Sequence, residues 1–344
     1  MPNYNPKKIG MLLAGDVGGT KTLLGLFERS QPRPVLRTLR TYPTNAFARV
    51  VDILHAFARE APHDDAVEAV ALGVAGPVAS NRARLTNVSM DIVGEDIAAE
   101  LRVPRVRILN DLEALGVGVP ILLPDELLVL QEGRPHADGN AAVIAAGTGL
   151  GEAFLHRIDG RWIPLATESG HADFAARTDR ELELVRLLTR RYGRAEVEHV
   201  LSGPGIENLH RFTHLGGQCA VVEDIDAVGA AALVSQGALT GRCQGCVDAL
   251  RMFVSAYGAE AGNLALRGVT TAGLYVGGGI VRKILPLIEQ GSFMEAFVNK
   301  PPMKNLLSTI PVRIILNDQA GLVGAAAAAQ SLMEGPPSGG SVAS

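Results

Sequence analysis

The chain has 344 residues, of which 47% are hydrophobic, and its formal net charge is −4. This length is typical of two domains, and the hydrophobic content predicts folded cores rather than disorder. The slight negative charge and the lack of a long basic block exclude the usual signature of a nucleic-acid partner. No run of 18 apolar residues occurs, so no membrane-spanning helix is expected.

The chain contains three cysteines, Cys219, Cys243 and Cys246. An odd and small number is a poor basis for a disulfide framework, so a reducing, cytoplasmic compartment is expected. Cys243 and Cys246 form a lone Cys-x-x-Cys, but the next 30 residues contain no further Cys or His to complete a zinc site. We therefore expect ordinary core thiols here, and a surface position for His214.

The first predicted unit is a strand, a glycine turn and a second strand. Apolar runs at 11–14 and 23–27 flank five residues of interest: Asp16, Gly18, Gly19, Thr20 and Lys21. Adjacent glycines can adopt positive φ and lack a Cβ, so their N–H groups can approach a phosphate closely. An acid at a strand end is suited to hold hydrated Mg²⁺. The plain alternative is a hairpin turn without a ligand.

Strands and helices then alternate, which predicts a mixed sheet with helices on its faces. The expected strands are 35–42, 67–74 and 106–109, and the expected helices are 47–58, 91–101 and 112–119. The last of these strands ends in Asn110 and Asp111, at the edge where open α/β sheets bind ligands. Asp111 is suited to accept a hydroxyl proton as a general base. The alternative is that Asp111 is the N-cap of the following helix.

A second strand–turn–strand unit spans residues 141–158, with Gly147, Thr148 and Gly149 in its turn. Because both halves of the chain carry such a unit, we expect two similar lobes that face each other and clamp phosphates between the two turns. Neither turn has the spacing of a P-loop or of a Rossmann dinucleotide site.

A polar turn at 167–174 follows the second unit. Glu168 accepts hydrogen bonds and neutral His171 either donates or accepts, so the two could hold adjacent hydroxyls of a sugar. The alternative is a metal site made by Glu168, His171 and Asp173.

The rest of the chain is mostly helical, with two more strands. A helix expected from 196 is interrupted at 202–205 and resumes over 206–212. The other expected helices are 180–192, 227–239, 246–265 and 321–332, and the strands are 274–276, which runs into Gly277, Gly278 and Gly279, and 312–316.

Together these stretches resemble the bacterial glucokinase family, within the superfamily of actin-like ATPases and sugar kinases. The matching motifs run in family order at residues 15–20, 85–87, 109–111, 146–151, 168–174, 201–205, 277–281 and 321–324. The resemblance implies a two-lobed α/β fold of the actin-like (ribonuclease H-like) type, with mixed sheets flanked by helices and a cleft between the lobes. The implied small lobe is 1–115 with a returning helix at 318–332, the large lobe is 116–317, and 333–344 is a disordered tail.

The resemblance also implies ATP-dependent phosphorylation of glucose at its 6-hydroxyl, with Asp111 as the base. It assigns the sugar hydroxyls to Asn87, Asn110, Asp111, Glu168, His171 and Glu198. It assigns the ATP phosphates to Asp16, Gly18, Gly19, Thr20 and Lys21 in one turn and to Gly147, Thr148 and Gly149 in the other. Gly277, Gly278 and Gly279 would lie under the adenosine, and Asp16 would contact Mg²⁺ through water. The implied protein is a cytoplasmic homodimer that binds glucose and ATP but neither nucleic acid nor a membrane.

Three departures from the family pattern occur, and the two in the sugar loops, at Met90 and Ser169, leave the choice of sugar open. Met90 lies in a stretch where tryptophan is frequent, and Ala145 and Ser169 stand where glycine is usual. A kinase for fructose, mannose or an amino sugar is therefore an alternative. A sugar-sensing repressor would need a helix-turn-helix before the first hairpin, where only about ten residues stand. A chaperone-like ATPase would have no use for both Asn110-Asp111 and the pair Glu168 and His171.

Overall fold

The computed structural model describes residues 10–61, 66–85, 88–214 and 217–334. The chain divides into two compact units, the first ending at Leu122 and resuming at Gln319, the second comprising Leu123–Asp318. The last ten residues of the tail expected at 333–344 lie outside the described part.

The first unit is built on a five-stranded mixed sheet of order β3-β2-β1-β4-β8. Its strands are β1 (Met11–Val17), β2 (Lys21–Glu28), β3 (Val35–Pro43), β4 (Val67–Val74) and β8 (Val106–Asn110). β1, β4 and β8 run parallel, whereas β2 and β3 are antiparallel to their neighbours. The carboxyl ends of the three parallel strands therefore share one edge of the sheet.

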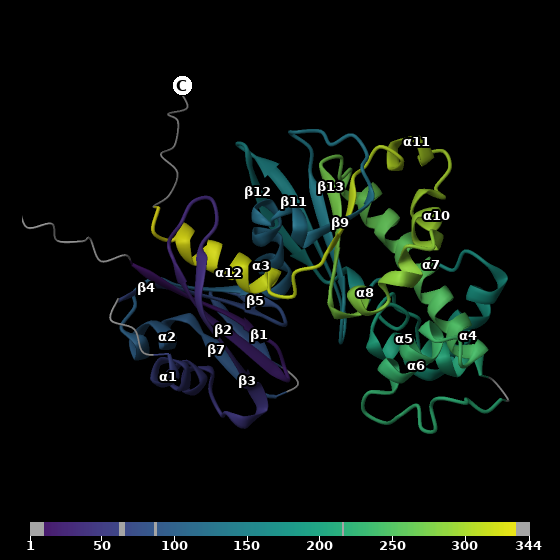
Figure 1. Cartoon of the computed structure of the whole chain (residues 1–344), viewed down its shortest axis with the longest axis horizontal. Helices are drawn as coiled ribbons and strands as arrows, with labels where there is room; N and C mark the ends of the chain where they lie inside the picture. The colour runs from purple at the N-terminus through teal and green to yellow at the C-terminus, as the bar shows by residue number, and fades with distance from the viewer. Residues whose placement is uncertain (1–9, 62–65, 86–87, 215–216, 335–344) are drawn as a thin grey trace, which may run out of the picture. The chain divides into compact units, whose positions relative to one another are not determined.

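Helices cover both faces of this sheet, because its central strands are apolar on both sides. Along β1, Leu13 joins the core formed with α1 (Val50–Glu60) and α2 (Gly94–Leu101). Its neighbour Leu12 joins the core formed with α3 (Asp111–Gly118) and α12 (Ala320–Ser331). Figure 1 shows α1 and α2 on one side of the strands and α3 and α12 on the other.

A small three-stranded sheet precedes α2 and was not predicted. It contains β5 (Val78–Ala79), β6 (Arg82–Leu85) and β7 (Met90–Val93). The helix expected from residue 91 begins only at Gly94, because residues up to Val93 pair with β6 and bury Met90 and Ile92. Similarly, the helix expected from residue 47 begins at Val50, after a short 3₁₀ turn η1 (Thr44–Ala46).

The second unit contains a six-stranded sheet of order β12-β11-β10-β13-β14-β9. The strands are β9 (Leu127–Gln131), β10 (Ala141–Ala146), β11 (Leu150–Ile158), β12 (Arg161–Thr167), β13 (Gly273–Gly277) and β14 (Val312–Ile315). An antiparallel meander β10-β11-β12 is followed along the chain by β13 and β14, which run parallel to β10. The first sheet has the same arrangement, with the meander β1-β2-β3 followed by β4 and β8. The two glycine turns therefore occupy equivalent positions in two sheets of the same design.

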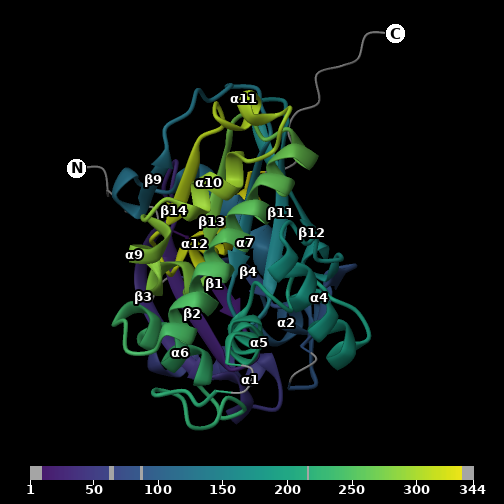
Figure 2. The ribbon, with the colours of Figure 1, turned by 90° about the vertical axis from the view of Figure 1, so that its right-hand side faces the viewer.

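The helices of the second unit bury their apolar faces around α7, a helix of 25 residues. They are α4 (Asp179–Tyr192), α5 (Gly203–Thr213), α6 (Ala230–Leu239), α7 (Gln244–Gly268), α8 (Gly279–Lys283), α9 (Leu285–Ile288), α10 (Ser292–Val298) and α11 (Lys304–Leu307). Figure 2 shows α10 beside α7, and the two helices are in contact. No helix in the described part of the chain is long and apolar enough to span a bilayer.

The expectation of a helix over 196–201 is wrong. Glu196 forms an isolated bridge with Asp173, residues 197–202 form bends and turns, and α5 begins at Gly203 with Ser202 as its N-cap. The Ser202 hydroxyl accepts a hydrogen bond from Gly205 N at 3.0 Å. Pro204 lies in the first turn of the helix, where a missing N–H costs nothing, so the Gly-Pro-Gly stretch starts this helix rather than breaking one.

Candidate active site

In the first unit, predicted site residues gather at the carboxyl edge of the sheet. Asp16 on β1 is opposite Gly73 on β4, which is opposite Leu109 on β8. Asp16 and Asn110 are therefore about two strand spacings, or about 10 Å, apart. Burial raises the pKa of Asp16, and the positive charge of Lys21 partly opposes this shift.

The turn from β8 into α3 presents Asp111. Asn110 is the N-cap, and its Oδ1 accepts hydrogen bonds from Leu112 N at 2.9 Å and Glu113 N at 3.4 Å. Its Nδ2 donates to Gly76 O at 3.0 Å. Asp111 is the first helical residue, so the alternative that it is the N-cap is wrong. Asp111 Oδ1 accepts from Leu112 N at 2.9 Å, and the positive end of the helix dipole favours negative charge at this position.

Thr44, which was not among the predicted site residues, makes two hydrogen bonds to the first glycine turn. The Thr44 hydroxyl donates to Gly18 O at 2.8 Å, and Thr44 N donates to Thr20 O at 3.0 Å. Gly18 and Gly19 are not among the glycines with a positive φ, so the property of theirs that matters here is the lack of a Cβ. Thr20 and Lys21 are exposed at the tip of the turn, next to the half-buried glycines.

The second glycine turn is closed by hydrogen bonds to two other segments. Gly203 N, at the start of α5, donates to Gly147 O at 2.9 Å, so the positive end of this helix lies at the turn. Glu198 Oε2 accepts from Leu150 N at 2.7 Å. A Cβ at Gly149 would lie 2.5 Å from the same Glu198 oxygen, so a glycine is needed for this contact.

The third glycine segment begins where β13 ends, beside β10. Gly278 has φ +91°, and a Cβ there would lie 2.1 Å from Ala146 O, so glycine is required on both counts. The buried hydroxyl of Tyr257, from α7, accepts from Ala146 N at 3.2 Å and lies 3.3 Å from both Ile144 O and Gly277 O. Burial raises the pKa of Tyr257, so this hydroxyl stays neutral. Tyr257 therefore joins the strand ends that carry the second and third glycine segments.

Glu168 and His171 are exposed around the short 3₁₀ turn η4 (Ser169–His171). Glu198 N donates to Gly170 O at 2.9 Å, so Glu198 lies beside this turn. His171 Nδ1 is 2.8 Å from Glu196 Oε2, and this hydrogen bond raises the pKa of His171 and lowers that of Glu196. Among the described residues, Glu168, His171 and Asp173 do not gather their ligand atoms into a metal-binding group.

Each unit thus brings together its own share of the predicted residues. The first unit gathers Asp16, the turn at 18–21, Asn110 and Asp111; the second gathers the turn at 147–149, Glu168, His171, Glu198 and the segment 277–279. Asn87 lies outside the described residues. Sequence reasoning missed Thr44, Glu196 and Tyr257, since none of the three belongs to a recognisable motif.

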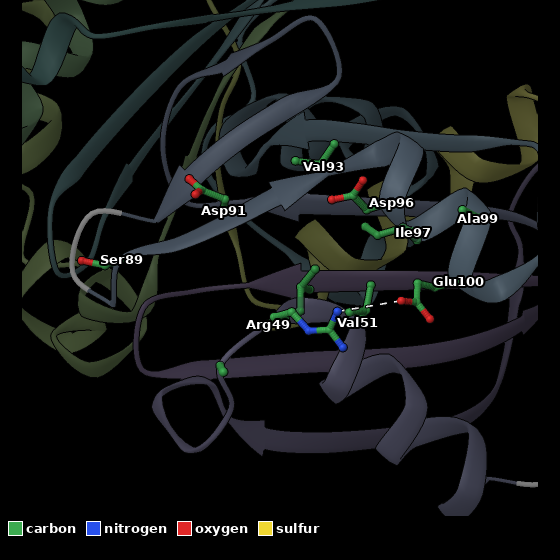
Figure 3. Close-up of a pocket in the computed structure, with 11 residues that line it drawn as sticks. Arg49, Val51, Ser89, Asp91, Val93, Asp96, Ile97, Ala99 and Glu100 are labelled. Carbon is green, nitrogen blue, oxygen red and sulfur yellow. Dashed lines mark ion pairs between the residues drawn. The ribbon is translucent and has the colours of Figure 1, made fainter.

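A cavity of about 450 Å³ in the first unit is separate from these groups. It lies between the start of α1 and the segment from β7 to α2, as Figure 3 shows. Arg49 and Glu100, 3.8 Å apart, are at its wall. No described residue predicted for catalysis or phosphate binding lines this cavity.

Comparison with known proteins identifies the family. A model of the glucokinase family matches residues 13–332. The chain belongs to the glucokinase family. The glucokinase of Synechocystis is 40% identical over 93% of this chain and 98% of its own length. This family assignment confirms the resemblance found from the motifs.

Solved structures agree with the glucokinase fold. A glucokinase from an Antarctic psychrotroph superposes with a TM-score of 0.82 at 28% identity, covering 93% of this chain and 99% of its own. A ROK-family glucokinase from Streptomyces griseus, solved with glucose and AMPPNP, has a TM-score of 0.63 at 21% identity and covers 94% of this chain and 100% of its own. The predicted fold class, with mixed sheets flanked by helices, is confirmed.

Proposed function

We infer that this glucokinase-family chain transfers the γ-phosphoryl group of ATP to the 6-hydroxyl of glucose. The family match over residues 13–332 is the observation that carries this inference. The name of the Synechocystis relative supports glucose as the substrate. The Streptomyces griseus enzyme, crystallised with glucose and the ATP analogue AMPPNP, supports ATP as the donor.

In the proposed mechanism, Asp111 is the general base. A sugar hydroxyl is a weak nucleophile at neutral pH, and a carboxylate within hydrogen-bond reach takes its proton as the bond to phosphorus forms. The new bond joins O6 of glucose to the γ-phosphorus, while the bond from that phosphorus to the β–γ bridging oxygen breaks and ADP leaves. The position of Asp111 in the first turn of α3 supports this role, because it places a carboxylate at the carboxyl edge of the sheet, where a helix N-terminus favours negative charge.

We assign the ATP phosphates to the two glycine turns, because phosphoryl transfer depends chiefly on positioning and on neutralising charge. Gly18, Gly19, Thr20 and Lys21 contribute one turn, and Gly147, Thr148 and Gly149 the other. The exposed Lys21 ammonium and the N-terminus of α5 beside Gly147 support the assignment. Gly277, Gly278 and Gly279 are assigned to the adenosine.

Asp16 is the proposed protein contact of Mg²⁺. Mg²⁺ prefers oxygen ligands and retains several of its waters, so a carboxylate that holds one of these waters is sufficient. The Asp16 carboxyl near the end of β1, two residues before Gly18, fits this contact. When bound, Mg²⁺ would neutralise charge on the phosphate oxygens.

The sugar hydroxyls are assigned to Asn87, Asn110, Asp111, Glu168, His171 and Glu198. Since Glu196 occupies Nδ1 of His171, the Nε2 atom of His171 is the one that would contact a sugar hydroxyl. Asn110 would also position the proposed base, because it caps α3 and so orders the backbone that carries Asp111.

The experiment that tests the proposed function is ADP release with Mg-ATP across a panel of glucose, fructose, mannose and N-acetylglucosamine. We expect the highest kcat/KM for glucose. A higher value for another sugar would reassign the substrate and keep the kinase, whereas no ADP release with any sugar would contradict the kinase and favour a sugar-sensing regulator.

The homodimer implied by the resemblance remains a proposal. Light scattering of the purified protein should then give about twice the chain mass of 36.2 kDa. A mass equal to that of one chain, unchanged over a hundredfold range of concentration, would contradict the dimer.

A further inference from the structure

Three cysteines and two histidines form a cluster in the second unit, outside the residues assigned to catalysis. His210 lies in the last turn of α5, His214 is the residue that ends this helix, and Cys219 follows in the next segment. Cys243 is the N-cap of α7 and Cys246 lies in its first turn. The ligand atoms of His210, His214, Cys219 and Cys246 all lie within 4.8 Å of one another.

The spacing of the sulfur atoms matches a tetrahedral zinc site. Cys219 Sγ lies 3.7 Å from both Cys243 Sγ and Cys246 Sγ. Two thiolates bound to one Zn²⁺ at about 2.3 Å and tetrahedral angles are about 3.8 Å apart. No two of these cysteines form a disulfide, so all three sulfurs remain available as ligands.

The imidazole of His214 is oriented as a ligand. Its Nδ1 is 2.9 Å from the carbonyl oxygen of His210, which can only accept, so Nδ1 carries the proton. The unprotonated Nε2 then faces Cys243 Sγ at 3.1 Å, and a separation of about 3.6 Å would accommodate zinc between them. A backbone carbonyl that fixes the tautomer in this way is the usual outer contact of a metal-bound histidine.

His210 is the second histidine of this cluster and packs against His214. Its side chain is 5% exposed, and neither of its ring nitrogens has a hydrogen-bond partner in the described part of the chain. Its ring stacks on that of His214 at 3.9 Å between centroids. His210 is not one of the four ligands proposed below, and its stacked ring supports the imidazole of His214.

We propose that Cys219, Cys243, Cys246 and Nε2 of His214 bind one Zn²⁺ tetrahedrally. His210 packs against the bound imidazole. Four protein ligands leave no open position for a substrate, so the site is structural rather than catalytic.

The expectation of ordinary core thiols considered only residues after Cys246, whereas both histidines and Cys219 precede the Cys-x-x-Cys pair. The expectation that His214 is a surface residue is wrong, because it is half-buried against Cys243.

The bound metal would connect the C-terminal end of α5, through His214, to the N-terminal end of α7, through Cys243 and Cys246. The opposite end of α5 carries Gly203, whose N–H binds the second glycine turn. α7 carries Tyr257, whose hydroxyl binds the strand ends beside the same turn. Zinc would therefore stabilise the two helices that support the phosphate-binding turn of the second unit.

The test begins with the unmodified protein, purified under reducing conditions without a chelator and analysed by elemental mass spectrometry. We expect about one zinc per chain, and a lower melting temperature after the zinc is removed by a strong chelator and restored by adding Zn²⁺. X-ray absorption at the zinc edge should show about three sulfurs at 2.3 Å and one nitrogen at 2.0–2.1 Å. A zinc content that stays below about 0.1 per chain after dialysis against micromolar Zn²⁺, with no change in melting temperature, would overturn the proposal.

Single variants assign the ligands. Cys219→Ser, Cys243→Ser, Cys246→Ser and His214→Ala should each reduce zinc content, whereas His136→Ala, which changes an exposed histidine outside the cluster, should not. Loss of zinc in His210→Ala but not in Cys243→Ser would overturn the proposed set of ligands. If a variant fails to fold, cobalt substitution of the unmodified protein still decides the question: a tetrahedral thiolate spectrum supports the site, and its absence contradicts it.

Discussion

Asp111 is the residue for which the proposed mechanism makes the sharpest prediction. Asp111→Asn keeps the size of the side chain and its ability to accept from Leu112 N, but removes the proton acceptor. We expect kcat to fall by roughly 10²–10⁴ while glucose affinity, measured by calorimetry, changes little.

The matched control for this variant is Asp125→Asn, at an exposed aspartate outside the proposed site, which should keep normal kcat. Near-normal kcat in Asp111→Asn would show that Asp111 is not the base. Partial recovery of kcat at high Mg²⁺ would instead indicate that Asp111 mainly holds the metal.

Glu196 is a positioning residue for His171. Its carboxylate raises the pKa of His171, so the imidazolium persists to higher pH in the native protein than it would alone. Glu196→Gln should lower the pKa of His171, measured by NMR titration, and raise the KM for glucose more than it lowers kcat. The exposed Glu183→Gln serves as the control. An unchanged His171 pKa together with an unchanged KM would contradict this role.

Glu152, on β11, predicts a pH dependence of stability. Its side chain is fully buried, neither carboxyl oxygen has a hydrogen-bond partner among the described residues, and burial, with a contribution from Glu260, raises its pKa to about 8. The native protein therefore keeps this proton up to about pH 8, whereas the unfolded chain loses it near 4.5. Raising the pH between these values favours unfolding by up to about 1.4 kcal/mol per pH unit.

Glu152→Gln removes this proton and should flatten the dependence of unfolding free energy on pH between 5 and 8. Denaturant unfolding at several pH values measures the slope, and Glu183→Gln should leave it as in the unmodified protein. Equal slopes in Glu152→Gln and the unmodified protein would show that Glu152 does not hold a proton in the native state.

At the scale of elements, Tyr257 links α7 to the ends of β10 and β13. Tyr257→Phe removes a hydroxyl that hydrogen-bonds with Ala146 N and a strand carbonyl, leaving buried backbone groups unsatisfied. We expect a loss of about 1–3 kcal/mol in unfolding free energy and a higher KM for ATP than for the unmodified protein.

Tyr42→Phe is the control for the tyrosine prediction, because the Tyr42 hydroxyl bonds Glu60 in the first unit and is not part of a glycine turn. It should leave the KM for ATP unchanged. If Tyr257→Phe retains both the stability and the KM of the unmodified protein, the hydroxyl does not hold the two strand ends together.

The sequence predicted the elements whose pattern is local. The hairpins around both glycine turns, the buried strand β4 and the strand leading to Asp111 follow from apolar runs that end at glycine or polar residues. β12 was missed because Pro164 argues against a strand, although proline is tolerated at the edge of a sheet. The start of α5 was missed because Gly-Pro-Gly usually marks a break.

The predicted site was incomplete for a similar reason. Glycine turns and the strand-end acid can be recognised along the chain, but Glu196 meets His171 only because Asp173 and Glu196 pair as an isolated antiparallel bridge. Thr44 and Tyr257 also act on residues distant in sequence. Such contacts depend on tertiary structure and carry no local signal.

At the scale of the whole molecule, the two sheets repeat one design, with a glycine turn after the first strand of each meander. β9 is the addition to the second sheet, pairing antiparallel with β14. Because the design is repeated, each unit carries one of the two glycine turns that are proposed to bind phosphate. The family assignment indicates that both turns serve the same reaction. The function therefore belongs to the complete chain rather than to either unit.

The most direct test of this account is the position of the phosphate on the product. The complete protein is incubated with Mg-ATP and glucose until turnover is complete, and the product is identified by phosphorus and proton NMR. We predict glucose 6-phosphate together with one ADP per sugar, and no ADP release with 6-deoxyglucose, which lacks the accepting hydroxyl. A phosphate at another position, or ADP release with 6-deoxyglucose equal to that with glucose, would contradict transfer to the 6-hydroxyl.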